Sequence, residues 1–504
     1  MSLKLLEPTL IGFDKSIPVK NRIALAPLTR GRSGFSQVPN DANAEYYAQR
    51  STAGLVITEA TIISKGGMGW AGAAAIYGKD HVAGWKKVVQ KVHEANGILF
   101  LQLWHMGRVA SSCFHGLQPV APSALKAEGR VTGYDGEKHS YELPHALTVD
   151  EIKAVQQEYL VAALNAKEAG LDGIEFHCAN GYLMDEFLQS CSNIRTDEYG
   201  GSFENRFRMI AEVLELLLSV FPSNRIGVRI SPNGSFGSMG SADNPQAFSY
   251  YLERFAAMNL AYIHIMDGLA FGFHNLSPPF TLADTRHIYK GTIIGNCGYD
   301  KESAEAAVQS GNADMIAFGR PYIANPDLPD RFAKNVPLAE AGHEIFWDYP
   351  GFPFGNPRIG YTDFPRHDEA VFQGECMCGL VKLEVHGDTS QQVYCHCNSC
   401  RSHAAASFVE GVLLTRSQVR VLSGREQLGV YRHTPSTHRS FCKVCGTHLS
   451  IEVPDLNLLS VFVHVLKDFV FKPTCHLNYS EKMLAMKDGL PKFSGMPGSV
   501  LLDE

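Results

Sequence analysis

The chain has 504 residues, which is too long for one compact core, so we expect two or more domains. A hydrophobic content of 45% is that of an ordinary globular protein, and a net charge of -7 argues against binding to nucleic acid or to an anionic membrane. The N-terminal residues show no secretory signal, and no apolar run is long enough to span a membrane. A cytoplasmic protein is therefore expected.

Over the first two thirds of the chain, short apolar runs alternate with longer amphipathic segments. The runs are predicted as eight buried strands: 22–28, 54–63, 98–104, 173–176, 226–230, 261–266, 292–295 and 315–318. The segments that follow them are predicted as eight helices: 42–52, 81–96, 149–169, 203–221, 245–258, 282–290, 301–310 and 327–334. Eight strand–helix units predict an α/β fold, a (β/α)8 TIM barrel. A doubly wound sheet is the alternative, but its Gly-rich turn after the first strand is missing.

Three connecting segments are distinctive. Residues 9–20 are predicted as a hairpin that closes the bottom of the barrel. Residues 109–147 form a long connection, which we interpret as a lid or binding loop. Residues 344–365 are rich in aromatic residues, glycine and proline, and we place the domain boundary at their end. The barrel would then span residues 1–365, and a smaller, mainly β domain would span residues 366–504.

The segment from residue 173 to residue 206 carries the most specific motif of the barrel. It reads GIEFHCANGYLMDEFLQSCSNIRTDEYGGSFENR. His177, Asn180 and Tyr182 fall on a turn that leaves a predicted strand, where parallel α/β folds place their chemistry. On their own they could be hydrogen-bonded loop residues. The H-x-x-N-G-Y and RTDEYGGSxENR motifs resemble the Old Yellow Enzyme family of FMN-dependent ene-reductases, and the resemblance covers roughly residues 1–365.

Other strand ends add polar groups at the same mouth of the barrel. Gly319 and Arg320 follow the last predicted strand and suit a phosphate group, although a surface arginine is the simpler reading of this motif alone. Arg229 is placed to stabilise the negative charge of a reduced flavin, while Gln102 and Thr29 can hydrogen-bond to its ring. The resemblance implies FMN contacts from the following residues: Pro27, Thr29, Ala60, Gln102, His177, Arg229, Gly295, Asn296, Gly319 and Arg320.

These residues also predict a reaction. Hydride transfer to an electron-poor alkene places negative charge on a carbonyl or nitro oxygen, and His177 and Asn180 are candidate donors to that oxygen. Tyr182 is the candidate acid that protonates the α-carbon. The resemblance implies NADPH as the electron source, and we expect its nicotinamide to enter the substrate pocket. Candidate walls of that pocket, for which ordinary packing is an equal alternative, are Trp104, Phe271 and Trp347.

Eight of the 12 cysteines lie after residue 372, and seven of them form short clusters. In a reducing compartment such clusters indicate metal binding rather than disulfides. One set suits a closed tetrahedral zinc site: Cys376, Cys378, Cys442 and Cys445. A second set suits a zinc ion with one open position: Cys395, Cys397 and Cys400. The alternative is one structural zinc with three spare thiols.

The motifs G-x-C-x-C-G, C-H-C-x-x-C-R and F-C-x-x-C-G-T resemble the family of glutathione-dependent formaldehyde-activating enzymes, or centromere-protein-V-like fold. The resemblance implies two zinc ions per chain and a site for glutathione or a thiol adduct near the second one. Arg401 matches the arginine that follows the middle cluster. The family's tryptophan before its terminal acidic-Gly-Leu-Pro phrase is missing here, although Asp488-Gly489-Leu490-Pro491 is present.

The leading interpretation is an NAD(P)H-consuming ene-reductase for α,β-unsaturated carbonyl or nitro compounds. Its barrel is fused to a zinc domain with carbon–sulfur lyase activity on thiol adducts. The alternative is a flavin-dependent isomerase or reductase of a biosynthetic pathway, in which the zinc domain is only a structural or interaction module. The sequence leaves the physiological substrate and the oligomeric state open.

Overall fold

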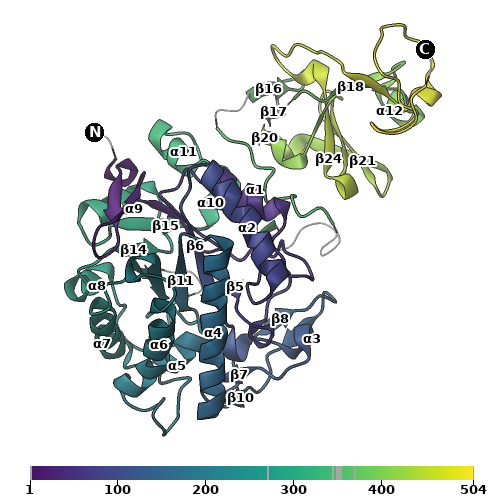
Figure 1. Cartoon of the computed structure of the whole chain (residues 1–504). Coiled ribbons are helices and arrows are strands. Elements are labelled where there is room, and N and C mark those ends of the chain that lie inside the picture. Colours follow the sequence, from purple (N-terminus) through teal and green to yellow (C-terminus); the bar gives the residue numbers. More distant parts are fainter. Residues whose placement is uncertain are drawn as a thin grey trace. The chain divides into compact units, whose positions relative to one another are not determined.

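A computed structural model describes residues 3–268, 272–342, 345–347, 355–367, 371–387 and 389–502. The chain divides into two compact units, Met1–Pro357 and Arg358–Glu504. In Figure 1 the first unit is a strand barrel surrounded by helices, and the second is a smaller unit built mainly of strands. The predicted boundary after residue 365 stays a prediction, because residues 348–354 and 368–370 lie outside the described residues.

Eight parallel strands form the barrel. In spatial order they are β3 (Ile23–Leu25), β4 (Leu55–Ile57), β6 (Leu99–Trp104), β11 (Gly173–Cys178), β12 (Ile226–Ile230), β13 (Tyr262–Met266), β14 (Ile293–Asn296) and β15 (Met315–Phe318). β11 pairs with both β6 and β12, and β15 pairs with β3, which closes the barrel. A short strand, β5 (Thr61–Ile62), adds to β6. The predicted TIM barrel is confirmed, and the doubly wound alternative is wrong.

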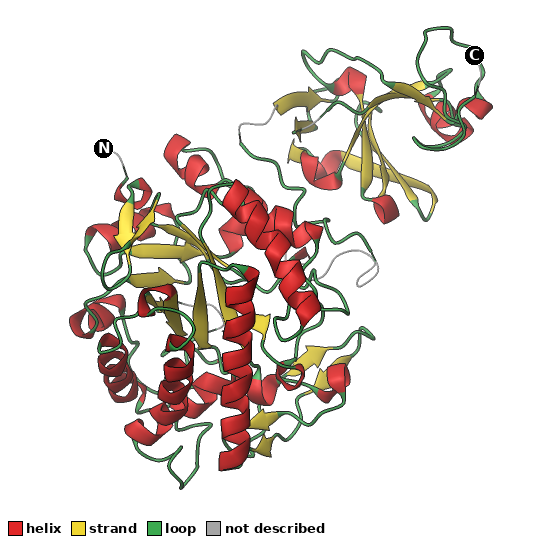
Figure 2. Cartoon of the chain, in the orientation of Figure 1, coloured by secondary structure: helices red, strands yellow, loops and turns green. Residues whose placement is uncertain are grey.

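The helices cover the outside of the barrel (Figure 2). All eight predicted helices form, with bounds close to the predicted ones: α1 (Asp41–Gln49), α2 (Lys79–Glu94), α4 (Val149–Ala169), α6 (Phe203–Leu218), α7 (Asn244–Ala256), α8 (Leu282–Ile288), α9 (Lys301–Gln309) and α11 (Leu328–Lys334). α4 shows why the bounds are predictable. Thr148 and Glu151 form a reciprocal capping box, and Gly170 ends the helix at φ 86°. Within the described residues, no helix is long and apolar enough to cross a membrane.

Two short helices follow barrel strands directly and were not predicted: α5 (Leu183–Leu188) and α10 (Arg320–Ala324). All six residues of α5 are buried, including Asp185 and Glu186, so the two carboxylates of this short helix do not face solvent. The connection after β6 also contains short elements of its own: η3 (Gly107–Val109), α3 (Ser112–His115), β7 (Val120–Ala121), β8 (Arg130–Thr132), β9 (Lys138–Ser140) and β10 (His145–Ala146). Its role as a lid or binding loop stays a prediction.

The N-terminal hairpin closes the amino end of the barrel, as predicted. β1 (Thr9–Ile11) and β2 (Ile17–Val19) pair in antiparallel register. The side chains of Ile11, Ile17 and Val19 are buried in one apolar cluster with residues that begin the barrel strands. The remaining short helices of the first unit are η1 (Lys4–Leu6), η2 (Lys65–Gly67), η4 (Ser223–Arg225) and η5 (Phe236–Ser238).

The second unit is mainly β, as predicted. One sheet contains β16 (Val371–Glu375), β17 (Lys382–His386) and β20 (Val419–Ser423). The other has the order β21 (Leu428–Thr434), β22 (Thr437–Cys442), β23 (His448–Val453), β24 (Leu458–Phe462), β19 (Val409–Leu414), β18 (Gln392–Cys395) and β25 (Cys475–Leu477). The helices are α12 (Asn398–Ala404), η7 (Arg416–Gln418), η8 (Arg425–Gln427), η9 (Pro454–Leu456), η10 (Val463–Val465) and η11 (Tyr479–Glu481). Apolar side chains from both sheets share one core, which includes Cys376 and Cys442.

Candidate active site and metal centres

A chain of hydrogen bonds crosses the barrel interior at the middle of the strands. Gln102 Nε2 on β6 donates to Glu175 Oε1 on β11 over 2.6 Å, and Glu175 Oε2 lies 2.9 Å from His264 Nδ1 on β13. Glu175 and His264 are fully buried. Burial alone would raise the pKa of Glu175, but nearby His264 and Arg229 bring it below its usual value. Glu175 is therefore a buried carboxylate that fixes the orientation of Gln102.

Arg229 on β12 is held by a second pair of bonds. Its Nη2 donates to Asn296 Oδ1 over 2.8 Å, and Asn296 Nδ2 donates to the Ala317 carbonyl over 2.7 Å. Arg229 is 5% exposed, and its Nε has no hydrogen-bond partner among the described residues. Because an unpaired buried donor of a cation is costly, this atom needs a partner from outside the chain.

The turn after β11 places the predicted catalytic residues together. The backbone N–H of Asn180, which has φ 61°, donates to Ser231 Oγ over 2.7 Å and so fixes the turn. The Tyr182 ring lies edge-on to the His177 ring, with 5.1 Å between their centroids. Burial, followed by the positive charge of Arg229, lowers the pKa of His177 well below its usual value. His177 is therefore neutral, and its Nδ1 has no partner in the described part of the chain.

Aromatic side chains surround Tyr182. Trp104, which is buried, meets the Tyr182 ring edge-to-face at 5.0 Å between centroids, and burial raises the pKa of Tyr182. Tyr182 thus keeps its proton at neutral pH. Trp347 packs edge-to-face on Trp70 at 5.6 Å. Its role as a pocket wall stays a prediction, and Phe271 lies outside the described residues.

A small hollow opens at this end of the barrel. Its lining comes from the turns after β11, β12 and β13: Asn180, Gly181, Ser231, Gly234, Phe236, Met266, Gly268 and Gly272. A larger hollow, of about 450 Å³, lies at the amino end beside the hairpin and is lined by Lys4, Lys15, Arg22 and Asp314 among others. TIM-barrel enzymes carry their chemistry at the carboxyl ends of the strands, so we assign the smaller hollow to the site.

The predicted phosphate residues lie at neighbouring strand ends. Asn296 ends β14, and Gly319 precedes α10, which begins at exposed Arg320. The Ala26 N–H donates to the Phe318 carbonyl over 3.0 Å, which brings the first loop, with half-buried Pro27 and Thr29, beside the end of β15. The two other predicted cofactor contacts, Gly295 and Ala60, are buried at the ends of β14 and β4.

The site residues fit a flavin. Three buried polar atoms at this mouth lack partners among the described residues: Gln102 Oε1, His177 Nδ1 and Arg229 Nε. A flavin ring offers carbonyl and N–H groups that can satisfy such donors and acceptors. The sequence analysis missed Glu175 and His264, which orient this set. The available signal was their position as polar residues inside the apolar runs GIEFHC and YIHIM.

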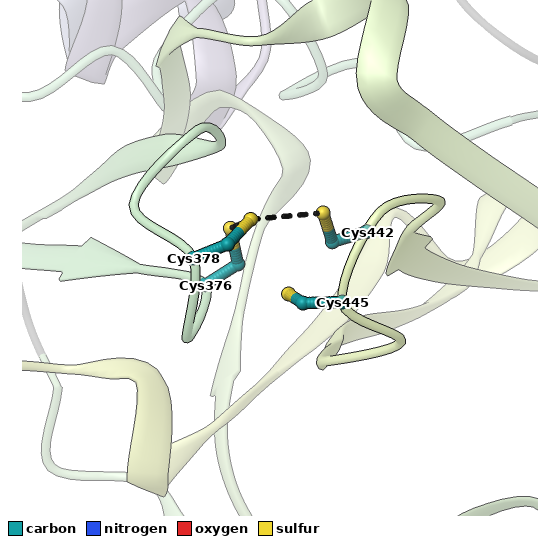
Figure 3. Close-up of side chains that lie close together, drawn as sticks. All are labelled: Cys376, Cys378, Cys442 and Cys445. Atoms are coloured by element: carbon teal, nitrogen blue, oxygen red, sulfur yellow. Dashed lines mark hydrogen bonds between the residues drawn. The ribbon is translucent and has the colours of Figure 1, made fainter.

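Four cysteines of the second unit converge on one point (Figure 3). Cys376 and Cys378 follow β16, Cys442 ends β22 and Cys445 lies in the next turn. Their sulfurs lie within 4.8 Å of one another, with 3.4 Å between Cys376 and Cys378 and 3.8 Å between Cys378 and Cys442. Zinc–sulfur bonds of about 2.3 Å in a tetrahedron place sulfurs about 3.8 Å apart. The set fits a closed zinc site.

The other three clustered cysteines also come together. Cys395 ends β18, and Cys397 and Cys400 lie at the start of α12, with all three sulfurs within 4.8 Å of one another. Hydrogen bonds from the sulfurs of Cys395 and Cys400 lower the pKa of Cys397. Three sulfurs leave a fourth tetrahedral position for an outside ligand. We call this set the cysteine trio.

Arg401, which follows the trio in the sequence, donates hydrogen bonds to backbone carbonyls. Its Nε donates to the His396 carbonyl over 2.8 Å and its Nη2 to the Glu481 carbonyl over 2.9 Å. Behind it, His396 Nε2 lies 2.8 Å from His476 Nδ1, and His476 Nε2 lies 2.8 Å from Asp488 Oδ2. The terminal Asp-Gly-Leu-Pro phrase thus contributes a carboxylate that fixes the loop around the trio.

Comparisons with known proteins agree with this division. Residues 4–339 match the NADH:flavin oxidoreductase / NADH oxidase family, and residues 371–481 match the glutathione-dependent formaldehyde-activating enzyme family. The chain is 39% identical over 369 residues to a "probable flavin mononucleotide-dependent alkene reductase" of Leishmania infantum, over 72% of this chain and 97% of that protein.

Two solved structures are similar to the barrel. The old yellow enzyme homologue from Zymomonas mobilis is 41% identical, with a TM-score of 0.67, over 72% of this chain and 99% of that chain. Morphinone reductase in complex with tetrahydroNAD is 38% identical, with a TM-score of 0.66, over 72% of this chain and 98% of that chain.

Proposed function

The chain belongs to the NADH:flavin oxidoreductase / NADH oxidase family and carries a C-terminal glutathione-dependent formaldehyde-activating enzyme domain. From this premise we propose that its barrel uses FMN and NADPH to reduce the C=C bond of α,β-unsaturated carbonyl or nitro compounds. The observation that carries the proposal is the set of unpartnered buried atoms at the barrel mouth: Gln102 Oε1, His177 Nδ1 and Arg229 Nε.

In this proposal several side chains hold the cofactor. Bound FMN would supply the hydride for the β-carbon of the alkene. Arg229 keeps a permanent positive charge beside the ring, and its bond to Asn296 fixes the direction in which its free Nε points. Gln102, oriented by Glu175, presents its free carbonyl oxygen to a ring N–H. Arg320, exposed at the start of α10, is available to a phosphate group.

The substrate is handled by the turn after β11. His177 and Asn180 hydrogen-bond to the carbonyl or nitro oxygen and stabilise the charge that grows on it. A neutral His177 suits this role, because it donates a hydrogen bond without losing a proton. Tyr182 then protonates the α-carbon. Its packing against Trp104 orients the ring, and its raised pKa keeps the proton in place until carbanion character develops.

For the electron donor, we propose that the nicotinamide of NADPH occupies the same mouth before the alkene enters. The support is that morphinone reductase, 38% identical to this chain, has been solved with tetrahydroNAD. One mouth used in turn by both molecules implies ping-pong kinetics.

For the second unit, we propose two zinc ions. The four-cysteine set would hold a structural ion, since it closes a tetrahedral shell. The trio would hold an ion with one open position, where a thiol such as glutathione binds and where a carbon–sulfur bond of a thiol adduct is made or broken. The two units would then act on the same electron-poor alkenes in the cytoplasm, because such alkenes add thiols readily.

The test begins with the absorption spectrum of purified full-length protein. We expect flavin bands, release of FMN on denaturation, and bleaching by NADPH without oxygen. Addition of 2-cyclohexen-1-one should restore the bands, whereas cyclohexanone, which lacks the C=C bond, should not. A colourless protein that FMN does not reconstitute would refute the proposal for the barrel, and fewer than two zinc ions per chain would refute that for the second unit.

A further inference from the structure

Arg439 on β22 is a buried cation with two hydrogen-bond donors that are not used. Its side chain is 3% exposed. Nη2 donates to Ser399 Oγ over 2.5 Å, but neither Nε nor Nη1 has a hydrogen-bond partner among the described residues. No carboxylate in the described part of the chain lies within ion-pair distance of the guanidinium. A buried charge with two unused donors is costly, so this residue requires a partner that the described chain does not supply.

Two contacts place Arg439 beside the cysteine trio. Ser399, which accepts its hydrogen bond, lies on α12 between the second and third cysteines of the trio. Arg439 also pairs in register with Ile451 on β23. Ile451 belongs to an apolar cluster into which Cys395 and Cys400 pack. The unused donors of Arg439 are therefore at the metal-binding end of the domain.

The sulfurs of the trio do not take up these donors. Nε and Nη1 of Arg439 have no hydrogen-bond acceptor among the described residues, although the positive charge of Arg439 is close enough to help lower the pKa of Cys397. The nearby imidazoles do not accept from these two donors either. His403 and His448 bond to each other, with 2.7 Å between Nε2 and Nδ1. Arg401, the other arginine here, is occupied by backbone carbonyls.

We propose that Arg439 binds the carboxylate of a thiol whose sulfur takes the fourth position at the trio's metal ion. The domain would then select thiols that carry a carboxylate, such as mercapto acids and cysteine-containing peptides. The inference rests on the proposed function of the trio as a metal site with one open position. The inference adds two points to that proposed function: a reason why an arginine is buried near the open position, and the class of thiol that would bind there.

The experiment uses full-length protein loaded with cobalt(II) in place of zinc, in which a bound thiolate gives a sulfur-to-metal absorption band. It compares 3-mercaptopropionate with 3-mercaptopropionamide, which differ only in the charged group. We expect the acid to bind about 10- to 100-fold more tightly than the amide, the range for a hydrogen-bonded charge. Arg439→Gln should remove this preference with the cobalt content unchanged. Arg432→Gln, at an exposed arginine of β21, is the matched control and should keep it.

The outcomes separate the two proposals. Binding of the amide tests only whether the metal ion has an open position. If the parent protein bound the acid and the amide equally well, the role of Arg439 would be overturned, but the open position would still be supported. A preference that persists in Arg439→Gln would also overturn it. A spectrum that neither thiol changes would refute the open position itself, and the role of Arg439 with it. If Arg439→Gln does not hold cobalt, the acid and the amide are compared in Arg439→Lys and in the parent protein, and these two comparisons decide the role of Arg439.

Discussion

Glu175→Gln tests the hydrogen-bond chain inside the barrel. The parent carboxylate accepts from Gln102 Nε2 over 2.6 Å and pairs with His264 Nδ1 over 2.9 Å. Burial and the neighbouring Arg229 charge lower the pKa of His264, so its ring is neutral and Nδ1 donates. Glutamine has one acceptor oxygen, so it keeps one of these bonds and turns its NH2 group toward the other donor.

The expected cost follows from this geometry. A hydrogen bond to a charged group contributes about 1.5–3 kcal/mol, and a buried donor left unpaired costs about 1–3 kcal/mol. Together these two terms amount to about 2.5–6 kcal/mol. The glutamine also removes the negative charge nearest to buried Arg229. We therefore expect the free energy of unfolding of the barrel to fall by about 3–5 kcal/mol.

Urea unfolding followed by tryptophan fluorescence measures this change. The four tryptophans, at positions 70, 85, 104 and 347, all lie in the first unit, so the signal reports the barrel alone. At an m-value of about 3 kcal/mol/M, the midpoint should fall by about 1–2 M urea. Glu168→Gln is the control, since Glu168 makes an exposed pair with Lys86 and should change stability by less than about 0.5 kcal/mol. A Glu175→Gln midpoint equal to the parent's would refute the reasoning.

Three further predictions concern the sites. His177→Ala and Asn180→Ala should each slow enone reduction about 10²–10³-fold, while NADPH still reduces the flavin. Stopped-flow absorbance measures the two half-reactions separately. If both variants reduced the enone at the parent rate, the assignment would be disproved. Cys442→Ser should lower the zinc content and make residues 358–504 protease-sensitive, because structural zinc binding is part of the folding free energy; full zinc content would contradict the closed site. Burial raises the pKa of Glu59 to about 7, so the stability that its protonated form provides is present below its ordinary pKa and is lost as pH rises through 7. Glu59→Gln should flatten the fall in the unfolding midpoint between about pH 4.5 and 7, and an unchanged pH profile would show that Glu59 is ionised throughout.

The barrel was predictable because its signals are local. Thr148, Glu151 and Gly170 mark the two ends of α4 in the sequence, and the structure begins and ends that helix there. Each of the eight apolar runs contains a barrel strand, although β3 and β4 occupy only part of the predicted runs 22–28 and 54–63. α5 was not predicted, because six residues are too few for the helical spacing of Leu183, Met184, Phe187 and Leu188 to be told from a loop.

The sequence predicted which residues lie at the candidate site, but not which side chains hydrogen-bond to one another there. Sequence order places His177, Asn180 and Arg229 at strand ends, yet it does not show that Asn296 accepts from Arg229. That bond joins two strands 67 positions apart in the sequence. The buried charge of Arg439 was missed for the same reason, since only the folded sheet shows that no carboxylate of the described residues lies within ion-pair distance of it.

The hairpin at the amino end of the barrel has a consequence for how this protein can change. Ile11, Ile17 and Val19 bury apolar surface at the end of the barrel opposite to the candidate site. Part of the folding free energy is therefore generated far from the loops of the candidate site. Substitutions at Phe236, Met266 or other residues of the small hollow can alter which alkene fits without disturbing that apolar plug. Such a separation favours evolvability, because new specificities can be explored while stability stays above the threshold for folding.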